Sequence, residues 1–173
     1  MRKDVIECAT EYQSILFPVF TNSTLINNSY IDLLKKSNNL LPVLSIEGSH
    51  TNTDERRGKG IYDTVVSKMD DLNKNNILFA TSLTVTTENL KEITSSEFID
   101  SIYSKGCKGV IFVEYVPLTK NTEHLALSDN ERNTLEHNIN TLKTKMRICF
   151  LYRFREMRRI PEDVLRQAED FSI

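Results

Sequence analysis

The chain has 173 residues, and 39% of them are apolar, which is enough for one globular domain with a core of its own. Its 22 lysine and arginine residues nearly balance 24 aspartate and glutamate residues, giving a net charge of −2. A chain so close to neutral has no overall field that attracts nucleic acid or an anionic membrane. We therefore expect no nucleic acid partner and no membrane partner.

The three cysteines, Cys8, Cys107 and Cys149, are far apart and never at CxxC spacing. This pattern argues against a disulfide framework, a zinc site or an iron–sulfur cluster held by this chain alone. No secretory signal stands near Met1, and every apolar run is far shorter than the roughly 20 residues that span a bilayer. These features predict a cytoplasmic protein.

In chain order, the hydrophobic pattern alternates between the periods of helices and strands. An opening helix is expected around residues 4–12, before the first strand. Short, almost continuously apolar runs are typical of strands covered on both faces in a parallel sheet, and they lie at residues 15–20, 40–46, 77–85 and 110–116. Two sets share a helical face: Ile61, Val65, Met69 and Leu72, and then Leu135, Ile139, Leu142 and Met146.

The ends of the later helices are marked by capping residues. Thr94 precedes Glu97, and Ser128 precedes Glu131, both at the spacing of a capping box. Gly106 stands where the helix that follows Glu97 needs a left-handed residue at its carboxyl end.

The resulting order, βαβαβαβα, predicts an α/β fold with about four parallel strands and right-handed crossovers. It fits either a doubly wound sheet or part of a (β/α) barrel, since four strands cannot close an eight-stranded barrel. In both architectures, chemistry gathers at the carboxyl ends of the strands. Polar residues follow each predicted strand there: Thr21, Asn22 and Ser23; Ser45 to Asp54; Thr84, Thr86 and Thr87; and Glu114, Tyr115 and Thr119.

Two interpretations of these polar residues remain open. Threonine, asparagine and serine commonly cap helices and turn the chain, without any binding role. Glu47 and Glu114 fit that interpretation less well, because carboxylates at strand ends face the mouth of a sheet rather than open solvent.

Other local patterns are weaker. Gly58-Lys59-Gly60 suggests a phosphate-binding loop, but the GxxxxGK[ST] spacing is absent, and flexibility before the helix at Ile61 is the simpler role. Arg56 and Arg57 either clamp a carboxylate or phosphate or are solvated on a loop. The histidines, His50, His124 and His137, have none of the spacings typical of metal ligands, so no metal site is expected.

Four segments carry a resemblance to a known family: "LFPVFTNSTLI", "LLPVLSIEGSHTNTDERRGKGIYDTVVSKMDDLNKNNI", "FATSLTVTTENLKEI" and "GVIFVEYVPL". In this order they resemble the middle and later strands of the radical S-adenosylmethionine (radical SAM) barrel. The likeness is to the peptide- and protein-modifying branch that includes anaerobic sulfatase-maturating enzymes, and it covers residues 1–146. It implies a partial radical SAM (β/α) barrel over this range.

The resemblance also implies a set of SAM contacts. By position, Ser45 would contact the methionine or ribose portion, Arg57 the SAM carboxylate, and the backbone near Val113 the adenine. A guanidinium fork suits a carboxylate, and a hydroxyl suits a ribose or amine. Three further strand-end residues are counted with this expected SAM site: Asn22, Glu47 and Thr84.

Two motifs of the family do not occur in this sequence. These are the CxxxCxxC loop that holds a [4Fe–4S] cluster and the Gly-Gly-Glu stretch that binds the SAM amino group. We therefore expect a [4Fe–4S] cluster in intact relatives but not on this chain, and at most weak SAM binding. The usual Thr-Asn-Gly is Thr-Asn-Ser here, so Ser23 must accept the backbone geometry that the glycine serves.

The composition changes after Met146. Up to that residue there are four arginines and twelve lysines, and beyond it there are six arginines and no lysine or asparagine. Residues 147–173 are therefore set apart as an atypical carboxyl-terminal tail. It is either a genuine terminal helix beginning near Pro161 or the product of a shifted reading frame.

Two functions follow from the sequence. The first is a fragment of a radical SAM enzyme, which in intact form reductively cleaves SAM for radical chemistry on a peptide or protein substrate. This chain alone is expected to be inactive, and a complementary chain would supply the amino-terminal half-barrel. The alternative is a non-catalytic α/β binding or scaffold protein that pairs an exposed strand edge with another chain or with a second copy.

Overall fold

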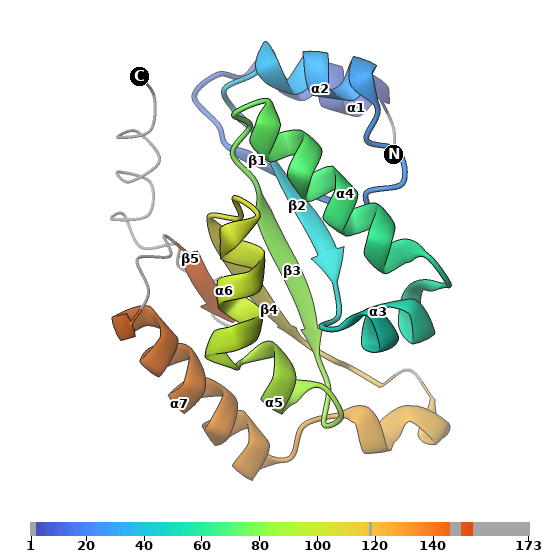
Figure 1. Cartoon of the computed structure of the whole chain (residues 1–173), viewed down its shortest axis with the longest axis vertical. Helices are drawn as coiled ribbons and strands as arrows, with labels where there is room; N and C mark the ends of the chain where they lie inside the picture. The colour runs from blue at the N-terminus through green and yellow to red at the C-terminus, as the bar shows by residue number, and fades with distance from the viewer. Residues whose placement is uncertain (1–2, 118, 146–149, 154–173) are drawn as a thin grey trace.

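The structure is a computed structural model that describes residues 3–117, 119–145 and 150–153. The elements run in the order α1 (Lys3–Ala9), β1 (Phe17–Thr21), α2 (Asn28–Lys35), β2 (Leu40–Ile46), α3 (His50–Arg57), α4 (Ile61–Lys74), β3 (Ala80–Val85), α5 (Leu90–Ile93), α6 (Ser96–Ser104), β4 (Gly109–Glu114), the 3₁₀ helix η1 (Lys120–Leu125), α7 (Asp129–Lys145) and β5 (Phe150–Arg153). The strands form one open sheet (Figure 1).

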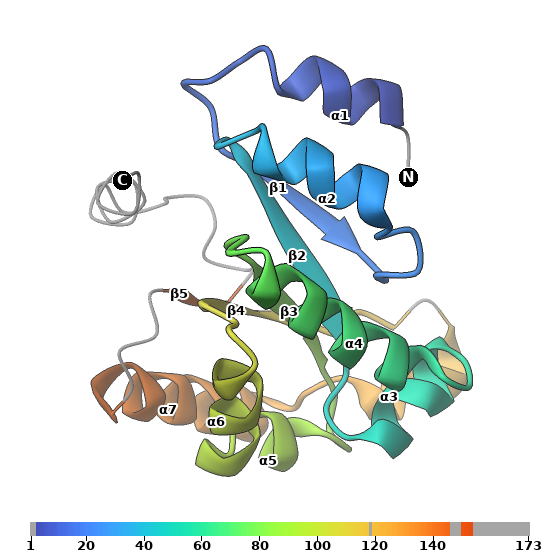
Figure 2. The same cartoon turned by 45° about the horizontal axis from the view of Figure 1, so that its top comes forward.

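All pairings in this sheet are parallel, and the spatial order β1-β2-β3-β4-β5 is the order along the chain. A doubly wound sheet reverses its strand order at a switch point, whereas a (β/α) barrel adds each strand to the same edge. The observed order therefore confirms the predicted α/β class and selects the partial barrel. Figures 1 and 2 both show α4 and α6 on the same side of the strands.

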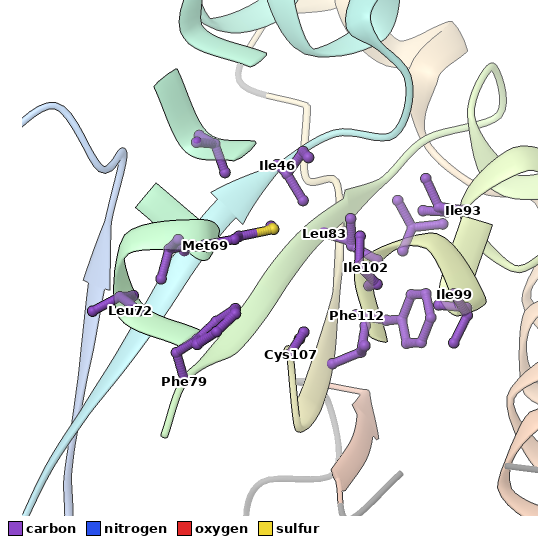
Figure 3. Close-up of a cluster of buried hydrophobic side chains, with 14 of the residues drawn as sticks. Ile46, Met69, Leu72, Phe79, Leu83, Ile93, Ile99, Ile102, Cys107 and Phe112 are labelled. Carbon is purple, nitrogen blue, oxygen red and sulfur yellow. The ribbon is translucent and has the colours of Figure 1, made fainter. Parts of the chain in front are cut away.

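The main core lies between the sheet and these helices. Leu83 and Phe112 on the strands, and Met69 and Ile99 on the helices, are fully buried in one cluster (Figure 3). α7 joins the same cluster through Leu135. Because side chains alternate along a strand, every second residue of β2, β3 and β4 packs in this layer.

The opposite face, here called the inner face, carries a smaller cluster made only of strand residues. Val43, Ala80 and Ile111 are buried there, with Leu41 and Val113 packed against them. Fully buried parallel strands need apolar residues on both faces. This is why the sequence showed short continuous apolar runs rather than an alternating pattern.

The predicted strands are confirmed, with small shifts at their ends. β2 has the bounds that were expected, whereas β3 begins at Ala80 rather than at Ile77. Pro42 has no N–H to donate, and the β2–β3 ladder begins one residue later, at Val43 and Ala80.

β5 is a further parallel strand, paired with β4 inside the segment that was set apart as a tail. The proposed domain boundary after residue 146 stays a prediction. The helix expected near Pro161 lies outside the described residues.

The helix signals were correct in one case and displaced in another. At the start of α7, the Ser128 N–H donates to Glu131 Oε2 at 2.9 Å and the Glu131 N–H donates to Ser128 Oγ at 3.4 Å, as a capping box requires. The cap of α6 is Ser95, whose Oγ accepts from the Phe98 N–H at 3.2 Å, and not Thr94. Thr94 instead closes α5, and its hydroxyl donates to the Leu90 carbonyl.

α3 was expected to be a loop, and this was wrong. Its sequence, HTNTDERR, has no apolar residue, and Thr53 is its only buried position. The helix is held at its start by Ser49, whose Oγ accepts from the Asn52 N–H. Arg56 and Arg57 consequently lie in the last turn of a helix at the carboxyl edge of the sheet.

Candidate functional site

The expected SAM-site residues gather at the carboxyl ends of β2, β3 and β4, with one exception. Ser45 on β2 lies opposite Ser82 on β3, and their hydroxyl oxygens are 3.0 Å apart. Thr84 on β3 lies opposite Val113 on β4. Alternation along the strands places these four residues on the inner face, in two successive rows.

Glu47 follows β2 directly and is the most enclosed charge of the site, with 1% of its side chain exposed. Its Oε1 contacts Nη2 of Arg57 and lies 3.4 Å from Nε of Arg56. From the neighbouring strand, the Thr84 N–H donates to Oε2 at 3.2 Å and the Thr84 hydroxyl donates to Oε1 at 3.3 Å. The carboxylate therefore accepts donors from both β3 and α3.

Arg57 is the expected SAM-carboxylate ligand, and it pairs with this internal carboxylate. Its side chain is 23% exposed. Nε of Arg57 is buried and has no hydrogen-bond partner among the described residues. A guanidinium carries five N–H donors, so the contact with Glu47 leaves part of its hydrogen-bonding capacity unused.

Arg56 points from the same turn toward the end of β4. Its guanidinium carbon lies 5.2 Å from the ring centroid of Tyr115, the distance of a cation–π contact. The two residues line a cleft of about 420 Å³ together with Asn52, Glu55, Thr86, Glu88, Asn89 and Leu125. Of the six expected SAM-site residues, only Val113 lines a described cavity, a neighbouring one of about 330 Å³.

Asn89 ties the two strand ends together and was missed from the sequence. It is 4% exposed, and its Nδ2 donates to the backbone carbonyls of Glu47 at 3.1 Å and Thr84 at 2.8 Å. Its Oδ1 accepts from the Thr86 N–H, while the Asn89 N–H donates to the Thr86 hydroxyl. This reciprocal Thr-x-x-Asn pair is a capping pattern that the sequence displays directly after β3.

The turn between β2 and α3 depends on Gly48 and Thr53. Gly48 has a φ of 117°, a conformation that side chains rarely adopt. The Thr53 hydroxyl accepts from the Glu47 N–H at 3.1 Å and donates to the Gly48 carbonyl at 3.3 Å. These bonds fix the chain direction immediately after Glu47.

The structure also explains the glycines before α4. Asp54 accepts from the N–H groups of Gly60 at 2.6 Å and Tyr62 at 2.9 Å. These bonds, first the one from Tyr62, hold the pKa of Asp54 below its usual range. A donor that a phosphate loop would need is thus already engaged by the chain's own carboxylate, which argues against the phosphate-loop interpretation.

Glu114, the other strand-end carboxylate, has a different environment. It is 15% exposed, and its Oε2 accepts from Nε of Arg132 on α7 at 3.0 Å. Arg132 also pairs with Asp129 at 2.8 Å. The bond to Glu114 is the larger cause that raises the pKa of Arg132.

Among the residues that the structure describes, Asn22 makes no hydrogen bond to the other site residues. Its Oδ1 accepts from the N–H of Thr24 at 3.3 Å and from the Thr24 hydroxyl at 2.8 Å, which turns the chain after β1. The neighbouring Ser23 is buried and has a φ of 70°, the left-handed backbone that a glycine would take. Ser23 therefore adopts the left-handed backbone conformation that was expected where Thr-Asn-Ser replaces Thr-Asn-Gly.

The metal-ligand candidates are dispersed. Cys8 is exposed on α1, and Cys107 is buried just before β4, while Cys149 lies outside the described residues. Within residues 3–117, 119–145 and 150–153, no three histidine, cysteine or acidic side chains are grouped as a metal site would require. Over the same residues, no helix has the length and apolar character to cross a membrane.

Comparisons with known proteins agree with this architecture. The chain matches no family model and no curated protein sequence. It does match solved structures of radical SAM enzymes. SuiB of Streptococcus suis bound to S-adenosylmethionine has a TM-score of 0.71 at 18% identity, covering 86% of this chain and 35% of that chain.

Two further structures have the same fold. SuiB bound to the precursor peptide SuiA has a TM-score of 0.64 at 16% identity, over 86% of this chain and 34% of that one. anSMEcpe with bound AdoMet and the Kp18Cys peptide has a TM-score of 0.65 at 17% identity, over 83% of this chain and 43% of that one.

The chain has part of the radical SAM barrel fold. The resemblance noted in the sequence is thus confirmed for the fold. The chain spans about a third to two fifths of the length of these structures. At identities of 16–18% the likeness establishes the fold alone.

Proposed function

We propose that this chain belongs to the radical SAM proteins and binds the amino-acid portion of SAM at the carboxyl ends of β2 to β4. The observation that carries the proposal is the buried Nε of Arg57, which has no hydrogen-bond partner among the described residues. A buried polar group without a partner is costly and is expected to be satisfied by a ligand. Arg57 pairs with Glu47, which directly follows β2, and solved structures with the same fold have SAM bound.

The residues at this edge of the sheet fit the chemical groups of SAM. The guanidinium of Arg57 suits the SAM carboxylate, since forked N–H donors match carboxylate geometry. The hydroxyl of Ser45 suits the methionine or ribose portion, and the backbone near Val113 offers donors and acceptors to adenine. The N–H and hydroxyl of Thr84 already donate to the Glu47 carboxylate, so the role of Thr84 in this proposal is to hold that carboxylate.

SAM supplies radical chemistry when it is reductively cleaved, and that step needs an electron donor. Cys8 is exposed on α1 and Cys107 is 2% exposed before β4, so these two described cysteines are not placed to hold a cluster together. We therefore assign this chain SAM binding and orientation, and no step that runs through a cluster. Inactivity of the isolated chain remains part of the proposal.

A peptide or protein is the substrate class that we propose for the intact protein. Solved neighbours are bound to the precursor peptide SuiA and to the Kp18Cys peptide. A complementary chain carrying the rest of the barrel would complete such a protein. If no SAM is bound, the scaffold alternative becomes the better account, because both β1 and β5 are open edges of the described sheet.

Calorimetric titration with SAM tests the proposal. We expect measurable binding by the wild-type chain, and we expect Arg57→Ala to weaken it by about 1–3 kcal/mol, the range for one charge-assisted contact. Arg56 is a poor control because it also contacts Glu47. Lys105→Ala is better matched, since it removes a basic side chain from a carboxylate partner, Asp70, at the opposite, amino end of the strands. Absence of SAM binding, or equal losses in both variants, would contradict the proposal.

The absence of a cluster has its own test. After anaerobic reconstitution with iron and sulfide, we expect metal analysis and electron paramagnetic resonance to find no stoichiometric [4Fe–4S] centre on this chain. The reason is that cluster ligation needs three or four thiolates at one point. A stoichiometric centre on the isolated chain would overturn the assignment.

A further inference from the structure

Glu47 was expected to contact SAM itself, but its carboxylate is already surrounded by donors of the chain. With 1% of its side chain exposed, it has two arginines on one side and the N–H and hydroxyl of Thr84 on the other. A carboxylate has about four acceptor positions, and four donor groups converge on this one. Little capacity is left for a ligand.

The same contacts determine where the arginines lie. Arg57 is held through Nη2, and Arg56 is held near its Nε while its guanidinium lies against Tyr115. Two positive charges and one negative charge leave this three-residue cluster with a net charge of +1. Glu55 and Glu88 line the cleft beside Arg56, so the charge count alone does not specify a ligand. Nε of Arg57 does, because it is a buried donor without a partner among the described residues and a guanidinium suits a carboxylate.

We propose that Glu47 is a positioning residue for carboxylate recognition. It fixes the guanidinium of Arg57 so that the unpartnered Nε–H of that guanidinium meets the carboxylate of an amino-acid ligand, and it does not touch the ligand. Thr84 and Asn89 hold Glu47 in place, one through its carboxylate and the other through its backbone carbonyl. This inference rests on the proposed SAM site and specifies how that site distinguishes ligands.

The role predicts a selective defect. S-adenosylmethionine and decarboxylated S-adenosylmethionine share adenine, ribose, the sulfonium and the amino group, but only SAM has a carboxylate. Glu47→Gln keeps the size of the side chain and removes its charge, so Arg57 loses its fixed counter-ion. We expect SAM binding to weaken about tenfold or more, as for loss of one charge-assisted contact, with binding of decarboxylated S-adenosylmethionine unchanged.

Four variants and both ligands make the calorimetric test decisive: Glu47→Gln, Arg57→Ala, the double variant and Glu47→Asp. In Arg57→Ala, the added Glu47→Gln should cause no further loss of SAM affinity, because the group that Glu47 positions is gone. Glu47→Asp keeps the charge with a shorter reach and should retain part of the preference for SAM. Circular dichroism and thermal unfolding of every variant check that the comparison is made between folded proteins.

The possible failures are distinguishable. If the wild-type chain binds no SAM, the proposed function fails, and this inference fails with it. If the wild-type chain binds SAM but Glu47→Gln keeps the same ratio of the two affinities, only the positioning role is wrong. Equal fold losses for both ligands in a folded Glu47→Gln variant are one form of this outcome, since Glu47 would then support the site as a whole.

Discussion

The helix-facing side of the sheet and its inner face use the same strands in different ways. On the helix-facing side, Leu44, Leu83 and Phe112 are completely buried in the main core. On the inner face, the corresponding row at the carboxyl end contains Ser45 and Ser82, whose hydroxyls contact each other. The helix-facing side is filled with large apolar groups, which stabilise the fold. The inner face has polar groups at its carboxyl end, where we propose that a ligand binds.

The largest expected effect is in the main core. Phe112→Ala should lower the free energy of unfolding by about 3–5 kcal/mol, because it opens a cavity in a closely packed layer. Ser82→Ala, on the next strand but on the inner face, should cost only about 0.5–1.5 kcal/mol, the value of one hydrogen bond. Urea unfolding measures both, and similar losses would show that the two faces do not differ as described.

The second effect concerns the charged cluster at the end of β2. Arg57→Ala should destabilise the ligand-free protein by about 1–3 kcal/mol, because a buried carboxylate loses its nearest positive charge. Adding Glu47→Gln should restore part of this loss, since the uncompensated charge is removed. A double-mutant cycle by urea unfolding measures the coupling, and strictly additive losses would indicate that the pair contributes nothing.

A smaller effect is expected at the start of α6, which covers the helix-facing side. Ser95→Ala should cost about 1 kcal/mol because the Phe98 N–H loses its capping acceptor. Ser101→Ala makes the same chemical change inside the same helix, where the hydroxyl is exposed, and should have little effect. Equal unfolding midpoints for the two variants would indicate that a residue other than Ser95 caps α6.

The smallest effect is a dependence on pH near α3 and α4. The pKa of Asp54 is lowered below its ordinary value of 3.8, first by the N–H of Tyr62 and then by that of Gly60. Its stabilisation is therefore present above pH 3.8 and is lost as the pH falls through the lower pKa of the folded state. Asp54→Asn should flatten this part of the stability profile.

Urea unfolding from about pH 5 to about pH 3 measures that profile. Asp100→Asn, at an exposed aspartate on α6, is the control and should leave it unchanged. Identical slopes in wild type and Asp54→Asn would mean that these backbone bonds do not affect the carboxyl group.

The fold was predictable where burial alone determines the structure. The run from Leu40 to Ile46 is apolar because both faces of β2 are covered, and its bounds were correct. α3 was missed because Thr53 is its only buried residue and its ends depend on Ser49 and Asp54. Such a helix is stabilised by its caps, so a hydrophobic pattern contains little information about it.

The location of the candidate site was also predictable, because parallel strands bring their carboxyl ends to one edge. Its internal pairing was not. Glu47 and Thr84 are 37 positions apart, and only the β2–β3 register makes them neighbours. The sequence therefore indicated where Glu47 and Arg57 lie, while their direct contact required the structure. The Thr-x-x-Asn spacing marks Asn89 only as a local capping residue, whereas its bonds to the backbone carbonyls of Glu47 and Thr84 depend on the fold, so its role at the site was missed.

The residue Pro18 on the edge strand β1 has a consequence for what can dock beside it. The Phe17 N–H donates to the Asn39 carbonyl, toward β2, so the next residue faces the open side of the sheet. At that position proline has no N–H, and a strand added to this edge would find one donor missing. A strand from another chain that pairs with this edge therefore lacks one hydrogen bond at Pro18. This disfavours nonspecific strand addition and favours a partner strand that does not need a donor at that position.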